Sequence, residues 1–216
     1  MGTYPDHKTY QALYRKYYNR RDVVELLNLL EPLEGTRFLD LCGGDGRLAL
    51  SALAREAGEA VLVEQTVRMT PTDIEKSIEV HNSSTESFLD FAWMADVYFD
   101  RIGCRQGVNY WLTPETAKLT AYILNPGGIF AFNTFNQKPP KKPRTVQYEL
   151  EEQAFAEVSW LVGNTVHHMQ VREGLPPHHT SFKWISPEDF RRMLEPYFTI
   201  IERVDGKTTL YRCVKK

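Results

Sequence analysis

A glycine cluster between an apolar run and a helical pattern constrains the fold of this chain most strongly. The stretch LDLCGGDGRLAL, residues 39–50, begins with apolar residues, turns through Gly43, Gly44 and Gly46, and continues with apolar residues at helical spacing. Glycines are needed at such a turn whenever the backbone must approach a ligand closely. The stretch therefore predicts a strand, a ligand-binding turn and a helix in that order.

Short apolar runs alternate with helical segments along the first 136 residues. Helices are expected at residues 10–30, 47–57 and 114–124, the last with Thr113 as N-cap and Pro114 at its first position. Strands are expected at residues 38–42, 60–64, 78–81, 101–104 and 129–133. Such alternation predicts an α/β fold with a doubly wound, mostly parallel sheet and helices on both faces.

The pattern changes after Asn136. A Pro- and Lys-rich loop, QKPPKKPR, precedes strand-like runs at residues 145–151, 157–162, 165–172 and 179–184, with no helix between them. These runs predict a small antiparallel sheet added over the active site. A short helix capped by Ser186 follows, and residues 197–204 and 208–214 flank Asp205-Gly206, a strong hairpin signal. The main sheet is therefore expected to have seven strands and to end in an antiparallel hairpin.

These elements are expected to form a single domain, because 42% hydrophobic and 25% charged residues are typical of a globular protein of this length. Residues 1–34 would form a helical lid with a tyrosine stripe. Residues 35–136 would form the ligand-binding core, residues 137–185 the substrate cover, and residues 186–216 the last helix and hairpin of the core sheet.

The charge balance and the cysteines exclude several classes of function. With 28 acidic and 26 basic residues the net charge is −2, so no global basic field favours nucleic acid. No apolar run approaches the ~20 residues that span a bilayer, and the first residues lack a signal-peptide pattern, so we expect a cytoplasmic protein without a membrane partner. Cys42, Cys104 and Cys213 are scattered and predict buried free thiols, with neither a disulfide nor a metal site.

Charge also distinguishes between two ligands for the glycine turn. The letters GDGRLA satisfy a dinucleotide fingerprint, and Glu64 follows at the distance expected of a ribose-binding acid. However, Asp40 and Asp45 place carboxylates where a dinucleotide would put its pyrophosphate. This repulsion is costly in a partly desolvated cleft, so a cationic ligand is favoured over a nicotinamide dinucleotide.

The stretch FLDLCGGDG resembles the first motif of the class I S-adenosylmethionine (SAM) methyltransferases, whose cofactor carries a sulfonium and an ammonium group. The stretches LVEQTVRM, FDRIGCRQGVNYW and LNPGGIFAFNTF are similar to the family's second strand end, fourth strand and fifth strand. The chain departs from the family pattern at Cys42, which replaces the first loop glycine, and at residues 80–83, where no acid follows the third strand. The resemblance implies SAM as cofactor and a methyltransferase of the small-molecule type.

The resemblance also implies roles for individual residues. Asp40 would lie near the methionine ammonium, Glu64 would accept both ribose hydroxyls, and Met69 would pack against the adenine. The implied cofactor residues are Tyr14, Asp40, Cys42, Gly43, Gly44, Gly46, Glu64, Gln65, Met69, Asn82, Ser83, Arg105 and Gln106.

The acceptor is expected beyond the carboxyl ends of the strands, beside residues 104–110 and 133–136. Methyl transfer is an in-line displacement, which needs positioning and, when the acceptor must lose a proton, a base. Adjacent strand residues point to opposite faces, so one histidine of each pair, His167-His168 and His178-His179, is expected in the cleft. Exposed strand histidines are the alternative. The candidates are His168, His179 and Tyr110 for catalysis, and Asn109, Asn133, Asn136, His167 and His178 for the substrate.

Transfer to N or O of a small molecule is favoured because the added sheet resembles the substrate cover of sugar-amine and amino-acid methyltransferases. A peptide or RNA methyltransferase and a non-catalytic SAM-binding protein remain as alternatives. The basic loop with Lys138, Lys141, Lys142 and Arg144 could hold an acidic or phosphorylated substrate. The protein is expected to be a monomer or a homodimer.

Overall fold

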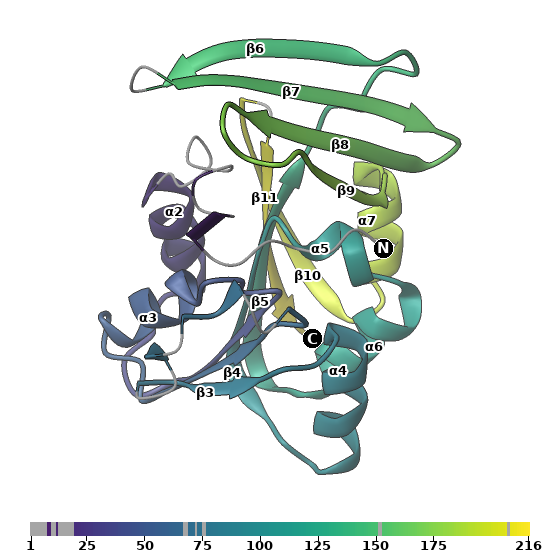
Figure 1. Cartoon of the computed structure of the whole chain (residues 1–216). Helices are drawn as coiled ribbons and strands as arrows, with labels where there is room; N and C mark the ends of the chain where they lie inside the picture. The colour runs from purple at the N-terminus through teal and green to yellow at the C-terminus, as the bar shows by residue number, and fades with distance from the viewer. Residues whose placement is uncertain are drawn as a thin grey trace.

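The fold is built from two separate β-sheets, which Figure 1 shows in a computed structural model of the chain. The structure describes residues 8–9, 12, 20–66, 69–71, 73–74, 77–150, 153–206 and 208–216. A seven-stranded sheet has the order β10-β11-β5-β4-β1-β2-β3, and a four-stranded sheet has the order β6-β7-β8-β9.

The larger sheet is parallel except at one edge. Strands β1 to β5 pair in parallel with their neighbours, whereas β11 pairs antiparallel with both β5 and β10. The predicted doubly wound sheet with a closing antiparallel hairpin is therefore confirmed. Its strands are β1 (Arg37–Leu41), β2 (Glu59–Val63), β3 (Glu79–His81), β4 (Phe99–Arg105), β5 (Leu124–Phe135), β10 (Phe198–Asp205) and β11 (Thr208–Lys215).

Helices cover both faces of this sheet and enclose two hydrophobic cores (Figure 1). One core lies between the sheet and α2 and α3, and the other lies between the sheet and α4, α6 and α7. The helices are α2 (Arg20–Leu30), α3 (Arg47–Leu53), α4 (Thr85–Met94), α5 (Val108–Trp111), α6 (Pro114–Tyr122) and α7 (Pro187–Leu194).

Most predicted element boundaries agree with the structure within a few residues, and the differences have local causes. Helix α3 ends at Leu53 rather than at residue 57, because the chain turns there and Glu56 takes a left-handed φ of 67°. Helix α4 was not predicted, although Ser84 caps it and its buried residues Phe88, Leu89 and Ala92 follow helical spacing. The predicted tyrosine stripe lies outside the described residues.

The smaller sheet lies across the end of the larger sheet toward which the arrow of β5 points (Figure 1). We call it the cover sheet. It runs antiparallel in chain order, as predicted, through β6 (Arg144–Leu150), β7 (Gln153–Val162), β8 (Thr165–Arg172) and β9 (His178–Lys183).

The registers of the cover sheet decide which side chains share a face. His168 lies opposite Ser159 on β7 and opposite Thr180 on β9. Because cross-strand partners point to the same side of a sheet, these three side chains lie together on one face. Leu161 and Val166, on that same face, are buried, so it is the inner face of the cover sheet.

Among the described residues, no helix is both long and apolar enough to cross a membrane. All three cysteines are free; Cys104 and Cys213 are buried, as predicted, and Cys42 is half-buried.

Candidate functional site

A cavity of about 1170 Å³ lies between the carboxyl ends of the parallel strands and the cover sheet. Its floor comes from the segments that follow β1, β2 and β4, including Gly43, Glu64 and Gln106. Its opposite wall comes from the inner face of the cover sheet, including Glu157, Ser159 and His168. One cavity therefore joins the predicted cofactor end to the predicted acceptor end.

Asp40 is fully buried directly beneath the glycine loop. Its Oδ2 accepts the backbone N–H of Ala49 at 3.1 Å, while its Oδ1 is buried with no hydrogen-bond partner among the described residues. A Cβ at Gly43 would lie 2.6 Å from the Asp40 carboxyl carbon, so only glycine lets the backbone pass this side chain. The loop thus holds a buried carboxylate with one oxygen left to bind a ligand.

Glu64 ties the end of β2 to the same loop. Its Oε2 accepts the N–H of Gly44 at 3.0 Å, and its Oε1 accepts the N–H of Thr66 at 2.8 Å. Each carboxylate oxygen can accept a second hydrogen bond, so both retain capacity for a pair of hydroxyl groups. Met69 lies nearby, with its methyl 3.5 Å from where a Cβ on Gly44 would stand.

The carboxylates at this loop favour a cation. Burial, with the nearby charges of Asp45 and Glu64, raises the pKa of Asp40 to about 8, although the Ala49 N–H and Arg105 lower it. Burial also raises the pKa of Glu64. A positive group would stabilise the ionised form of both side chains, whereas a pyrophosphate would add negative charge beside them. The geometry therefore disfavours a dinucleotide at this loop.

Cys42 occupies a backbone position that favours glycine, and the neighbouring Gly107 leaves room for its side chain. Its φ of 54° is in the left-handed region, which explains why the family pattern has glycine there. A Cβ at Gly107 would lie 2.5 Å from the Cys42 Cβ, so the missing side chain at Gly107 makes room for the thiol. The Cys42 Sγ lies 3.3 Å from the Thr85 hydroxyl, and its hydrogen bond with Cys104, together with burial, raises its pKa.

A hydrogen-bonded link joins α2, the loop after β4 and β5. The Gln106 backbone N–H donates to Asn133 Oδ1 at 2.8 Å, and the Gln106 side chain donates to Asp22 at 3.2 Å. Gln106 itself has a left-handed φ of 58°. Asn133 was predicted to contact the substrate, but it is buried and does not line the cavity. It instead fixes the conformation of the loop that does.

The middle of the cavity is formed by α5 and β9. Asn109 donates to the Lys183 carbonyl at 3.1 Å and accepts the Thr134 hydroxyl at 2.5 Å, so its side chain is fixed. Tyr110 is 43% exposed and its ring lies 5.5 Å from that of Phe182. Both Asn109 and Tyr110 line the cavity.

One histidine of each pair does lie on the inner face, but the second is His178 and not His179. His168 lines the cavity, and its Nδ1 lies 2.8 Å from the Ser159 hydroxyl and its Nε2 lies 3.2 Å from Gln170 Nε2. The register pairs His179 with Met169, on the opposite face from His168. The ring of His179 lies beside that of His167, although the residue borders the cavity, so its catalytic role stays a prediction.

His178 is buried opposite Gln170 and does not line the cavity. Burial lowers its pKa to about 4, and the nearby His168 and His179 add to that effect. His178 is thus a neutral, buried residue of the inner face. His167 belongs to the outer face, and neither residue lines the cavity.

The cavity brings together most, but not all, of the predicted site residues. Predicted residues that line it are Asp40, Cys42, Gly43, Gly44, Glu64, Gln65, Met69, Arg105, Gln106, Asn109, Tyr110, His168 and His179. Those that do not line it are Gly46, Asn82, Ser83, Asn133, Asn136, His167 and His178. Tyr14 lies outside the described residues.

Of the other predicted residues that do not line the cavity, Gly46 and Asn136 have structural roles. Gly46 begins α3 with a φ of 71°, and a Cβ there would meet Ile74 at 2.1 Å. Asn136 donates to the carbonyls of Gly206 and Thr208, which holds the turn between β10 and β11. Asn82 is exposed, and Ser84, Thr85 and Glu86 line the cavity in place of Asn82 and Ser83.

Two groups of cavity residues were not among the predicted site residues. Ser84, Thr85 and Glu86 open helix α4, and the N-cap signal of Ser84 would have found them. Glu157, Ser159 and Thr180 lie on the inner face of the cover sheet, which only the strand register reveals. Of the basic loop, Lys138 and Arg144 line the cavity, whereas Lys141 and Lys142 are exposed and do not.

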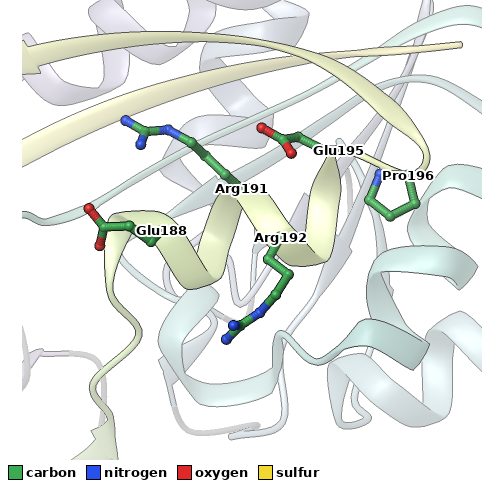
Figure 2. Close-up of a pocket in the computed structure, with 5 residues that line it drawn as sticks. All are labelled: Glu188, Arg191, Arg192, Glu195 and Pro196. Atoms are coloured by element: carbon green, nitrogen blue, oxygen red, sulfur yellow. The ribbon is translucent and has the colours of Figure 1, made fainter.

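A second, shallower hollow of about 460 Å³ lies on α7 and is lined by Glu188, Arg191, Arg192, Glu195 and Pro196. Figure 2 shows Arg191 and Arg192 pointing to opposite sides of that helix. Arg191 donates to Glu202 at 2.7 Å and Arg192 pairs with Asp189, so both cations are neutralised locally. In the part of the chain that the structure describes, no three His, Cys, Asp or Glu side chains are grouped to hold a metal ion.

Comparison with known proteins gives matches of two kinds. A family model described as "Conserved hypothetical protein 95" matches residues 21–91, and no curated protein sequence matches the chain. A SAM-dependent methyltransferase from Clostridium acetobutylicum is 17% identical, with a TM-score of 0.71, over 95% of this chain and 95% of that chain.

Two further similar structures are of sugar methyltransferases. A sugar N-methyltransferase from Streptoalloteichus is 16% identical, with a TM-score of 0.70, over 100% of this chain and 97% of that chain. A SAM-bound amino pentose methyltransferase from Micromonospora echinaspora is 13% identical, with a TM-score of 0.64, over 96% of each chain. The chain therefore has the fold of these proteins over nearly its whole length.

Proposed function

We propose that this chain is a SAM-dependent methyltransferase that transfers a methyl group to N or O of a small-molecule acceptor. One observation carries the proposal: a single cavity joins an acidic glycine loop to a polar inner wall on the cover sheet. A cavity of about 1170 Å³ is large enough to take a cofactor and a small acceptor side by side. The wall formed by the cover sheet makes the cavity concave, which suits a small molecule.

The chain's own residues fit SAM at the loop end. Asp40 lines the cavity, and its Oδ1, which has no hydrogen-bond partner among the described residues, could accept from an ammonium group. The two oxygens of Glu64, oriented by Gly44 and Thr66, suit the two hydroxyls of a ribose. Met69 provides an apolar contact beside Gly44 for the base. When bound, SAM supplies a methyl group that is already activated by its sulfonium.

The opposite wall would position the acceptor. Tyr110, on α5, and His168, on β8, line the cavity from its two sides. Ser159 and Gln170 hold the His168 ring at both nitrogens, which fixes its orientation. The Gln170 Nε2 can only donate, so Nε2 is the unprotonated nitrogen of the neutral His168 ring. We assign His168 as the base: its Nε2 would exchange Gln170 for the acceptor and take the acceptor's proton. Tyr110 and Asn109 are assigned as positioning residues. Lys138 and Arg144 give the mouth of the cavity a positive charge suited to an anionic group on the acceptor.

Incubation with methyl-labelled SAM tests this function. Extracts of small metabolites, total RNA and a peptide library would each receive the protein, and mass spectrometry would follow the label. We expect label in a small molecule, and loss of that label with Asp40→Asn. Label only in RNA or peptide would contradict the small-molecule acceptor. Absence of transfer to all three pools, with SAM bound, would support the non-catalytic alternative.

A further inference from the structure

Three aromatic rings from neighbouring strands line up on the outer face of the cover sheet, opposite the face of His168. They are Trp160 on β7, His167 on β8 and His179 on β9. The Trp160 ring lies 5.1 Å from the His167 ring and 5.8 Å from the His179 ring, with interplanar angles of 12° and 16°. The proposed function uses none of these three side chains in its chemistry.

The two imidazoles meet through their nitrogens. His167 Nδ1 lies 3.2 Å from His179 Nε2, and the two rings are within 5° of parallel with centroids 5.4 Å apart. One hydrogen between two facing nitrogens explains this arrangement in the neutral pair. Both nitrogens become available to an ion once that hydrogen is displaced.

The spacing suits a metal ion. Imidazole nitrogens bind Zn²⁺ at about 2.0–2.1 Å, so two of them on a tetrahedral ion lie roughly 3.3 Å apart. The observed 3.2 Å is close to that value, and the two rings would turn to direct both nitrogens at the ion. His179 is exposed, so an ion can approach from solvent.

We propose that His167 and His179 form a surface site for a divalent transition-metal ion of the Ni²⁺, Cu²⁺ and Zn²⁺ class, for which imidazole is a preferred ligand. Met169 lies opposite His179 on the same face and adds a soft thioether beside the pair. Water completes the coordination, because no third His, Cys, Asp or Glu joins the pair in the described part of the chain.

A bound ion would cross-link β8 to β9. His168 lies between His167 and Met169 in the chain, and Thr180 follows His179. The side chains of His168 and Thr180 both point to the inner face. The ion would therefore stiffen the wall of the cavity from behind. Because the site exists only when the two strands are paired, binding would also raise the stability of the folded chain.

Titration of the untagged full chain with Ni²⁺ tests the site. Calorimetry would measure affinity and stoichiometry, and tryptophan fluorescence would report on Trp160, which lies beside both imidazoles. The variants are His167→Gln, His179→Gln and Trp160→Phe. His81→Gln is the matched control, because His81 is a half-buried histidine that pairs with Glu79 at the far edge of the larger sheet.

We expect one ion per chain, with fluorescence quenching, and about tenfold or greater loss of affinity in His167→Gln and in His179→Gln, since each removes one of two ligands. His81→Gln should bind like the wild type, and Trp160→Phe should bind normally with less quenching. Thermal melting without metal would confirm that the variants fold. Equal affinity in His179→Gln and His81→Gln, or no saturable binding by the wild type, would overturn the site.

Discussion

Glu64 accepts the backbone N–H of Gly44 at 3.0 Å, so the carboxylate at the end of β2 holds the glycine loop that follows β1. Glu64→Ala removes this bond and the proposed ribose contact together. Hydrogen bonds to a charged group are worth about 1.5–3 kcal/mol, so SAM affinity should fall roughly ten- to hundredfold. Calorimetry with SAM measures the change.

Glu59→Ala is the control for this prediction. Glu59 stands at the other end of β2, where it pairs with Arg37 at 2.9 Å on the surface. It should leave SAM affinity unchanged. Wild-type affinity in Glu64→Ala would place the ribose contact elsewhere.

Asp40 gives the stability of the protein a defined pH dependence. Burial raises its pKa from 3.8 to about 8, so the folded state keeps a proton that the unfolded chain releases near pH 4. The contribution of Asp40 to the free energy of unfolding is therefore fully present below about pH 4 and is lost as the pH rises to about 8. Asp40→Asn cannot ionise and should lack this loss.

Urea unfolding of both proteins at several pH values between 4 and 9 checks the Asp40 prediction. Relative to Asp40→Asn, the wild type should become less stable across this range. Parallel pH profiles for the two proteins would show that Asp40 ionises in the folded state as it does in the unfolded chain.

Asn133 is predicted to act through the loop after β4. Asn133→Ala leaves the half-buried Gln106 N–H without its acceptor at 2.8 Å, and the loss of such a hydrogen bond costs about 0.5–1.5 kcal/mol. Chemical denaturation should show this loss. Asn136→Ala, which removes bonds to two loop carbonyls at a half-buried position, should cost less. Equal losses would contradict the special role of Asn133.

Variants of His168 and His179 can be compared to test the proposed base at the acceptor end of the cavity. The two residues occupy adjacent strands, but only the His168 side chain lies on the face that lines the cavity. His168→Gln should lower turnover by ~10²- to 10⁴-fold without changing SAM affinity, as general-base loss does. His179→Gln should retain wild-type turnover. If both variants remain fully active, Tyr110 and Asn109 act by positioning alone.

The sequence predicts the core of this protein better than its cover. The run from Leu39 to Leu50 predicts a strand, a glycine turn and a helix in that order, and the structure has all three. The helical spacing of Phe88, Leu89 and Ala92 also indicates α4, which was not among the predicted helices. Local patterns were therefore sufficient for the elements of the main sheet.

The cover sheet depends on register, which local patterns do not contain. The predicted strand at residues 179–184 begins one residue later than β9 (His178–Lys183). The prediction therefore leaves open which histidine faces inward. Pairing of Met169 with His179 decides it, and no single strand reveals that pairing. Similarly, Asn133 follows the fifth-strand pattern as predicted, but its bond to Gln106 joins residues 27 apart in the chain.

The most direct test of the account is a calorimetric titration of the purified chain with SAM and, separately, with NAD. The buried carboxylates of Asp40 and Glu64 favour a cationic ligand at the glycine loop, so we predict saturable binding of one SAM per chain and no appreciable binding of NAD. Saturable NAD binding, with no heat from SAM or its demethylated product, would contradict the account.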